Sequence, residues 1–277
     1  MLVEQDFKTI SDVIYRHCGI NLHDGKQELV EARIAKRVRE TGFPSARAYI
    51  DHVLADTSGD EFGHLVDAIS TNLTSFFRES NHFHYLVEHH LPGLLDRKRA
   101  RNDNRIRAWS AGCSSGEEPY TLAMVLTEAT ENEPTATAGR KWDVKILATD
   151  ISRKILAKAK AGAYEKLRLK DVPQFMQAKY FGPGPDKHTV VVGPELKRRI
   201  AFNYLNLMEP WPFTGPMDVI FCRNVMIYFD KPTQEKLVNR YYDMLDPGGV
   251  LFTGHSESLT GIRHKFRYTQ PTIYVKG

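Results

Sequence analysis

The sequence is poor in cysteine and contains neither a Cys-x-x-Cys pair nor a long apolar run. Its three isolated cysteines argue against a disulfide framework and against a zinc site, so we expect no metal and a reducing compartment. The longest apolar stretch, Tyr120–Leu126, is far shorter than the ~20 residues of a membrane span. The first residues also lack the pattern of a signal peptide. We therefore expect a soluble, cytoplasmic protein without direct membrane insertion.

A strong excess of charge of one sign is missing too. The 277 residues carry a formal net charge of +4, and 42% of them are hydrophobic, as in ordinary globular proteins. Residues 1–70 have a balance of −4, whereas residues 71–277 have a balance of +8. This small excess is not the basic stripe typical of nucleic-acid binding, so no nucleic-acid partner is expected. The asymmetry instead favours two domains with different partners.

Apolar residues at helical spacing dominate the first part of the chain. They predict four helices, near residues 6–15, 26–40, 46–54 and 61–70. A glycine and a proline after the second helix, Gly42 and Pro44, are a typical stop signal. This part shows no strand alternation. We expect an N-terminal all-helical domain over residues 1–75 and a linking helix over 76–104.

Short apolar runs alternate with helical patterns from about residue 105 onward. Strands are predicted near residues 106–109, 144–148, 200–205, 219–222 and 250–253, and helices near 117–130, 153–161 and 232–245. This alternation predicts an α/β domain over residues 105–277 with a mostly parallel sheet covered on both faces. The last two runs, near 266–269 and 272–275, are close enough only for antiparallel pairing. A turn-rich stretch at about 163–199 predicts a small inserted β-subdomain.

The first strand of this domain is followed by a glycine-containing turn. Gly112 and Gly116 permit close backbone approach, but they match neither a dinucleotide fingerprint nor a phosphate-binding loop. Glu117 and Glu118 follow immediately, and they would repel a pyrophosphate and attract a cation such as an amino-acid ammonium. They could instead simply favour the positive end of a helix.

Two further polar residues end the next strands. Asp150 could accept hydrogen bonds from ribose hydroxyls, or it could cap the following helix. Asn206 could pair with an adenine edge while Leu207 packs on the base, or it could serve only in a turn. With the glycines, these residues end three successive strands, which is the layout for a bound adenosine with a charged tail.

Two other segments carry polar groups of interest. Arg223, Asn224 and Tyr228 follow a strand at the place where active-site loops occur. Residues 71–79, Thr-Asn-Leu-Thr-Ser-Phe-Phe-Arg-Glu, contain two aromatic residues among polar ones. By composition alone, this second segment is best interpreted as a buried helix end with exposed neighbours.

Together these motifs resemble one known family. Residues 71–79, Gly-Glu-Glu-Pro-Tyr at 116–120, Ala-Thr-Asp-Ile at 148–151, residues 221–229 and Gly-His-Ser-Glu at 254–257 resemble the CheR family of bacterial chemotaxis receptor methyltransferases. The resemblance covers nearly the whole chain in the right order. It implies a Rossmann-like S-adenosylmethionine-dependent methyltransferase domain with an N-terminal helical domain and a small inserted β-subdomain. The implied activity is methylation of glutamate side chains on the cytoplasmic domain of chemoreceptors.

The resemblance also implies roles for individual residues. S-adenosyl-L-methionine, with S-adenosyl-L-homocysteine as product, would be bound by nine residues: Asn72, Thr74, Arg78, Glu118, Asp150, Asn206, Leu207, Arg223 and Asn224. Glu118 would hold the ammonium. Arg78 and a tenth residue, Tyr228, would lie near the sulfonium and the substrate and act in catalysis. The interpretation of residues 71–79 from composition is thereby replaced. A receptor C-terminal peptide at the β-subdomain is a further possible partner in this family.

A basic helix face offers a place for a glutamate-rich receptor helix. In the second predicted helix, Lys26, Arg33, Lys36 and Arg37 fall on one side, while Val30, Ile34 and Val38 turn toward the core. The alternative is a solvated face partly neutralised by Glu40. Two other functions remain open from the residues alone. One is a methyltransferase of the same fold acting on RNA or a small metabolite, and the other is a non-catalytic cofactor-sensing module.

Overall fold

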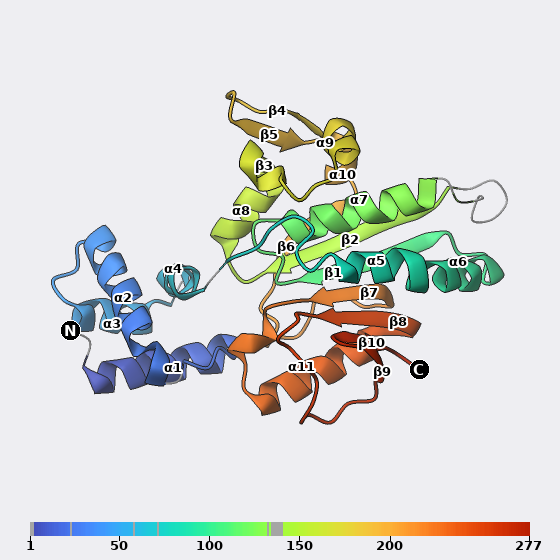
Figure 1. Cartoon of the computed structure of the whole chain (residues 1–277). Coiled ribbons are helices and arrows are strands. Elements are labelled where there is room, and N and C mark those ends of the chain that lie inside the picture. Colours follow the sequence, from blue (N-terminus) through green and yellow to red (C-terminus); the bar gives the residue numbers. More distant parts are fainter. Residues whose placement is uncertain (1–2, 23, 58, 71, 132, 134–140) are drawn as a thin grey trace.

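The helical first part of the chain is as predicted. The structure, a computed structural model, describes residues 3–22, 24–57, 59–70, 72–131, 133 and 141–277 (Figure 1). The first elements along the chain are α1 (Glu4–Cys18), η1 (Asp24–Lys26), α2 (Gln27–Thr41), α3 (Ala46–Ala55) and α4 (Asp60–Ile69). Gly19 and Gly42 end α1 and α2 in the left-handed conformation, at φ 74° and 77°. The helices pack around Ile10, Ile14 and Tyr49, which are fully buried.

The segment between the two domains is more than a linker. It contains α5 (Asn81–Tyr85), the π-helical turn η2 (Leu86–His90) and α6 (Leu91–Ala100). The helix thus begins at Asn81 rather than at residue 76, because residues 76–80 form a turn in which Phe77 and Glu79 have positive φ. Phe83 of α5 stacks on Phe221 of the sheet at 5.3 Å between ring centroids. These helices therefore cover one face of the sheet.

The second part of the chain is built on a seven-stranded sheet. Its strands are β1 (Arg105–Ala111), β2 (Asp143–Asp150), β6 (Ile200–Tyr204), β7 (Met217–Cys222), β8 (Leu245–Thr253), β9 (Arg267–Gln270) and β10 (Ile273–Val275). They lie in the order β6-β2-β1-β7-β8-β10-β9, in which the first five strands are parallel and β10 pairs antiparallel with both β8 and β9. The chain leaves β1 toward β2 and β6 and then returns to the other side of β1. This reversal creates a topological switch point, where open α/β sheets bind ligands.

Helices cover both faces of this sheet, as the alternating runs predicted. The main helices are α7 (Glu117–Glu131), α8 (Arg153–Ala161) and α11 (Lys231–Met244). Ile106 and Ala108 of β1 lie in one apolar cluster with residues of α7, whereas Trp109 and Ala111 lie in another with residues of α11. Successive strand residues thus point to opposite cores, which explains why these strands have apolar residues on both faces.

The insert forms the small β-subdomain that the turn-rich stretch predicted. It contains β3 (Ala163–Glu165), η3 (Lys166–Leu169), α9 (Gln174–Tyr180), β4 (Phe181–Pro183), β5 (Thr189–Val192) and α10 (Pro194–Lys197). The three strands pair antiparallel in the order β3-β5-β4. In Figure 1 the subdomain stands apart from the main sheet, at the top of the molecule.

The end of α1 joins the helical domain to the α/β domain. The Tyr15 hydroxyl donates to Asp230 at 2.7 Å, and the backbone N–H of Asn21 donates to the Tyr228 carbonyl at 2.8 Å. The helical domain thereby contacts the carboxyl end of the sheet, beside the switch point. Among the described residues, no helix has the length and apolarity needed to cross a lipid bilayer.

Candidate functional site

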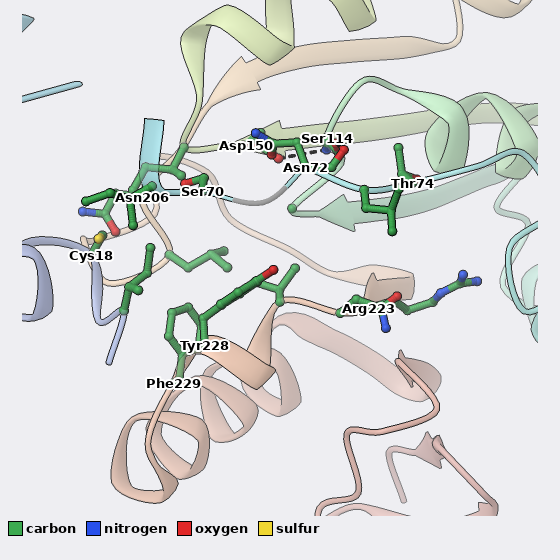
Figure 2. Close-up of a pocket in the computed structure, with 18 of the residues that line it drawn as sticks. Cys18, Ser70, Asn72, Thr74, Ser114, Asp150, Asn206, Arg223, Tyr228 and Phe229 are labelled. Atoms are coloured by element: carbon green, nitrogen blue, oxygen red, sulfur yellow. Dashed lines mark hydrogen bonds between the residues drawn. The ribbon is translucent and has the colours of Figure 1, made fainter. Parts of the chain in front are cut away.

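A cleft lies at the switch point, between the carboxyl ends of the parallel strands and the helical domain. It encloses about 1120 Å³ of space, including open solvent at its mouth. All ten residues proposed for cofactor binding or chemistry line it: Asn72, Thr74, Arg78, Glu118, Asp150, Asn206, Leu207, Arg223, Asn224 and Tyr228. Figure 2 shows Asn206 beside Cys18 at one end, Arg223 at the other, and Asp150 on the wall between them. The cleft is therefore elongated, with different polar groups at its two ends.

The glycine-containing turn after β1 forms part of the wall. Gly112 and Gly116 have φ values of 82° and 97°, as their predicted role requires. A Cβ atom on Gly112 would lie 2.3 Å from the Val225 side chain. The backbone N–H groups of Gly112 and Cys113 both donate to the Thr149 carbonyl, at 2.8 and 2.9 Å. This arrangement fixes the turn against β2 and leaves no room for a side chain at Gly112.

Asp150 is held in place by backbone donors. Its two carboxylate oxygens accept hydrogen bonds from the N–H groups of Ser114 at 2.8 Å and Ser152 at 2.9 Å. The alternative of a helix cap is wrong, because Ser152 is the N-cap of α8 and accepts from the N–H of Ile155. Burial raises the pKa of Asp150 to about 6. Each oxygen retains a lone pair, so the carboxylate can accept further hydrogen bonds from a ligand.

Asn206 is more constrained than the sequence suggested. Its amide nitrogen donates to the His17 carbonyl at 2.6 Å and to Glu209 at 3.1 Å, and its amide oxygen accepts from the N–H of Met208 at 3.0 Å. The turn interpretation is thus correct for the bond to Met208. Both amide hydrogens are used, so only one lone pair on the oxygen remains for a ligand. The neighbouring Leu207 supplies an apolar surface to the same end of the cleft.

The opposite end contains a buried arrangement of charges. Arg223 Nε lies 3.3 Å from Glu118 Oε2 and 3.6 Å from Glu79 Oε2, and the Arg223 side chain is only 2% exposed. Its guanidinium also lies within 5.5 Å of the Phe83 ring centroid. Ser110 donates to Glu118 at 2.7 Å. Desolvation raises the pKa of Glu118, and the nearby Arg223 opposes this shift.

Only one of the two adjacent glutamates faces the cleft. Glu117 is buried, forms an ion pair with Arg168 and accepts a hydrogen bond from Ser115. The expectation that both glutamates attract a ligand cation is therefore wrong for Glu117. Glu118 carries that expectation alone.

Residues 72–78 form a segment along the cleft, which Asn72, Leu73, Thr74 and Arg78 line. Thr71, the first residue of their motif, lies outside the described residues. The Asn72 carbonyl accepts from the Ser114 hydroxyl at 3.1 Å, and Arg78 donates to the Leu73 carbonyl at 2.7 Å. Phe76 is fully buried and packs edge-on against Tyr164. Phe76 is thus buried as its composition indicated, but residues 76–80 form a turn rather than a helix end, and Asn72, Thr74 and Arg78 line the cleft.

A residue without an assigned role, Glu257, organises the loop after β7. One of its oxygens accepts from the N–H groups of Asn224 at 2.7 Å and Gly254 at 2.6 Å, and the other accepts from Ile227 at 3.0 Å. Asn224 has a φ of 60°, and this buried carboxylate holds it there. Glu257 thereby positions the segment that carries Arg223 and Tyr228. The only sequence signal for it was its place in the Gly-His-Ser-Glu motif.

The basic face of α2 is partly committed to internal contacts. Val30 and Ile34 are buried as predicted. Arg37 makes three hydrogen bonds, of 2.7, 3.0 and 3.2 Å, to the carboxylate of Glu61, and its side chain is 17% exposed. Lys36 is exposed and lies 3.8 Å from Glu40.

Arg33 and Lys36 line a second cavity, to which Lys154 of α8 contributes. Lys26 lies elsewhere, with its ammonium 5.1 Å from the Tyr228 ring centroid at the cleft. The four basic residues of the predicted face are thus divided between two places.

Comparisons with known proteins agree along the whole chain. The family described as CheR methyltransferase, all-alpha domain, matches residues 5–70, and that described as CheR methyltransferase, SAM binding domain, matches residues 72–275. A probable chemotaxis protein methyltransferase of Rhizobium etli is 41% identical over 95% of this chain and 96% of its own length. The chemotaxis protein methyltransferases of Borreliella burgdorferi and Escherichia coli are 39% and 37% identical, each over 99% of this chain and over 95% and 91% of their own lengths.

Proposed function

The chain belongs to the CheR methyltransferase family, and from this premise we propose that it methylates glutamate side chains on the cytoplasmic domain of chemoreceptors. The product would be a glutamyl methyl ester, formed in the cytoplasm during adaptation in chemotaxis. The observation that carries the proposal is the single cleft lined by all ten residues expected to bind the cofactor or act in the reaction. Methylation of RNA or of a small metabolite is not favoured by the relatives.

The cleft fits S-adenosylmethionine in the order of its polar groups. Asn206 and Leu207 would take the adenine, with the Asn206 oxygen as the acceptor, and Asp150 would accept from the ribose hydroxyls. Glu118 would hold the ammonium at the other end, while Asn72, Thr74 and Asn224 complete the walls. Gly112 also lines the cleft, and Val225 fills the space that a side chain would take there. When bound, the cofactor supplies an activated methyl group.

The residues near the expected methyl group have a positioning role. A solvated glutamate has a pKa of ~4.3, so the acceptor is already a carboxylate at pH 7 and needs no general base. Orientation and preorganised electrostatics must therefore supply the catalysis. Arg78 is the proposed partner of the incoming carboxylate, and Tyr228 lies across the cleft from Asp150 and Ser114 (Figure 2). Arg223 would hold the Arg78 backbone in place, because its guanidinium contacts Glu118 and donates a hydrogen bond to the Arg78 carbonyl.

Receptor docking is proposed for α2 and for the β-subdomain. Arg33 and Lys36 would face a glutamate-rich receptor helix, with Arg37 contributing less because Glu61 already binds it. In the subdomain, β3 and β4 are the edge strands of the three-stranded sheet. Edge strands present unpaired backbone groups to which an extended peptide can add. A receptor C-terminal peptide is the proposed occupant.

Transfer of a radiolabelled methyl group from S-adenosylmethionine tests the proposal. The purified protein is incubated with membranes that contain chemoreceptors, and the labelled product is then treated with alkali. A glutamyl methyl ester releases volatile methanol under these conditions, whereas methylated nitrogen or ribose does not. Asp150→Ala should lose the label, and Lys236→Ala, at an exposed residue of α11 outside the cleft and the proposed docking surfaces, should retain it. Base-stable label, or label found in RNA or a small metabolite, would contradict the proposal.

A further inference from the structure

A fully buried histidine, His82 of α5, has both ring nitrogens next to polar groups. Its Nε2 lies 2.8 Å from the Thr272 hydroxyl oxygen, and that hydroxyl donates to the Pro271 carbonyl at 2.7 Å. With the Thr272 hydroxyl donating to Pro271, its oxygen accepts, and we assign the ring hydrogen of His82 to Nε2 on this basis. The Nδ1 atom then presents a lone pair.

The lone pair of His82 faces a carboxylate. Glu79 Oε2 lies 3.5 Å from His82 Nδ1, and the Glu79 side chain is only 11% exposed. Neither atom makes a hydrogen bond to any described residue. Two buried acceptors that face each other repel unless a proton or a cation lies between them.

A second histidine, His255, completes the group. One ring nitrogen of His255, one of His82 and one oxygen of Glu79 all lie within 4.8 Å of one another. The backbone N–H of His255 donates to Glu79 Oε1 at 3.3 Å, and its Nε2 lies 3.1 Å from Asn81 Oδ1. His255 is exposed, so the group is accessible from solvent.

The neighbouring guanidinium does not require Glu79 as its only partner. Arg223 Nε is 3.6 Å from Glu79 but only 3.3 Å from Glu118. If Glu79 moves toward a cation, Arg223 therefore remains paired with the nearer carboxylate.

From this geometry we propose that Glu79, His82 and His255 bind a divalent transition-metal ion, and Zn²⁺ is the best match. Two imidazole nitrogens and one carboxylate oxygen are a recurrent zinc donor set, whereas Mg²⁺ and Ca²⁺ prefer oxygen ligands alone. The hydrogen bond from Nε2 of His82 to Thr272 is the kind of support that metal-bound histidines have. The site lies outside the cofactor cleft, is connected to it through Arg223, and does not depend on the proposed function.

Metal binding itself, rather than methyl transfer, provides the test. The full-length protein is freed of metal with a chelator and titrated with Zn²⁺ against a chromophoric chelator, and Co²⁺ serves as a spectroscopic probe. One ion should bind per chain. His255→Ala and Glu79→Gln should each weaken binding by ~10–100-fold. His188→Ala removes an exposed histidine of the β-subdomain and should leave the affinity unchanged.

The variants also distinguish Zn²⁺ binding at this site from non-specific Zn²⁺ binding to surface histidines. Circular dichroism should first show that each variant is folded, and His255→Ala is the informative one because its side chain is exposed. If the wild-type protein and His255→Ala bind Zn²⁺ equally, the proposal is overturned, and a proton bridges Glu79 and His82 instead. If His188→Ala weakens binding as much as His255→Ala, the ion binds to surface histidines and the proposal is likewise overturned.

Discussion

The cofactor cleft and the basic face of α2 use charge in opposite ways. In the cleft, Asp150 and Glu257 are buried, and backbone N–H groups fix their orientation. On α2, the exposed Lys36 pairs only with the flexible Glu40 at 3.8 Å. Buried charged groups with fixed partners interact strongly, because their surroundings have a low dielectric constant. Exposed ion pairs contribute little to stability and are screened by salt. The difference indicates that the cleft is preorganised and that the α2 surface acts mainly through long-range attraction.

The largest expected effect concerns Arg223, because it is the most buried charge of the cleft. Arg223→Ala should lower the free energy of unfolding by ~3–5 kcal/mol, since Glu118 and Glu79 would lose their buried partner. Urea denaturation measures this change. Lys36→Ala on α2 is the matched exposed variant and should change stability only slightly. Equal losses of unfolding free energy in the two variants would show that charges of the cleft and of the α2 surface do not differ in their contribution to stability.

Arg78→Ala should reduce methyl transfer by ~10²–10³-fold, the typical effect of removing one preorganised electrostatic contact. Cofactor affinity should fall much less, because the proposed role of Arg78 is toward the receptor carboxylate. Steady-state kinetics together with calorimetry of S-adenosylhomocysteine binding separate the two effects. If turnover falls only in proportion to cofactor affinity, Arg78 is a cofactor contact alone.

Asp150→Ala should weaken S-adenosylhomocysteine binding by ~1.5–3 kcal/mol for each hydrogen bond lost to the charged acceptor, though not additively. The reason is that both carboxylate oxygens are held by backbone donors and line the cleft. Calorimetry on the folded variant measures the loss. Unchanged affinity would show that the ribose lies elsewhere.

The raised pKa of Asp150 predicts a pH dependence of binding. Its value in the folded protein is about 6, so the ionised form that accepts hydrogen bonds best is lost as the pH falls through 6. Affinity for S-adenosylhomocysteine should therefore decrease between pH 7 and pH 5. The intrinsic stability of the protein should change in the opposite direction, because a carboxyl with a raised pKa favours folding at low pH and loses this contribution as the pH rises through 6. Asp150→Asn should show neither change, and a pH profile of binding that persists in this variant would point to another group.

The smallest effect is expected on α2. Reversal of Arg33 and Lys36 to glutamate should reduce receptor methylation several-fold at low ionic strength and less at high salt, where exposed charges are screened. Cofactor affinity should stay the same, because neither residue lines the cleft. Arg37→Ala should instead lower stability, since Arg37 binds Glu61. Normal methylation by the double reversal at low salt would move the recognition surface elsewhere.

Local patterns in the sequence were sufficient to predict the elements and most of the cleft. The helix at residues 153–161 was predicted with its observed bounds, and the parallel strands followed from their alternation with helices. Residues at the carboxyl ends of parallel strands meet at one edge, so Asp150 and Asn206 could be expected together. The hydrogen bonds that Glu257 accepts could not be expected in this way, because their donors lie about thirty positions earlier in the chain. The same holds for the bond from Asn206 to the His17 carbonyl, which crosses between domains.

That bond between Asn206 and the end of α1 has a consequence for how the two domains cooperate. One hydrogen of the Asn206 amide is used by the helical domain, and the oxygen of the same amide is proposed to accept from the ligand. A ligand that binds the intact cleft more tightly than a cleft without α1 must, by linkage, strengthen the contact between the domains by the same free energy. The helical domain is in this sense a wall of the cofactor site as well as the proposed docking surface, and the two domains form one thermodynamic unit when the cleft is filled.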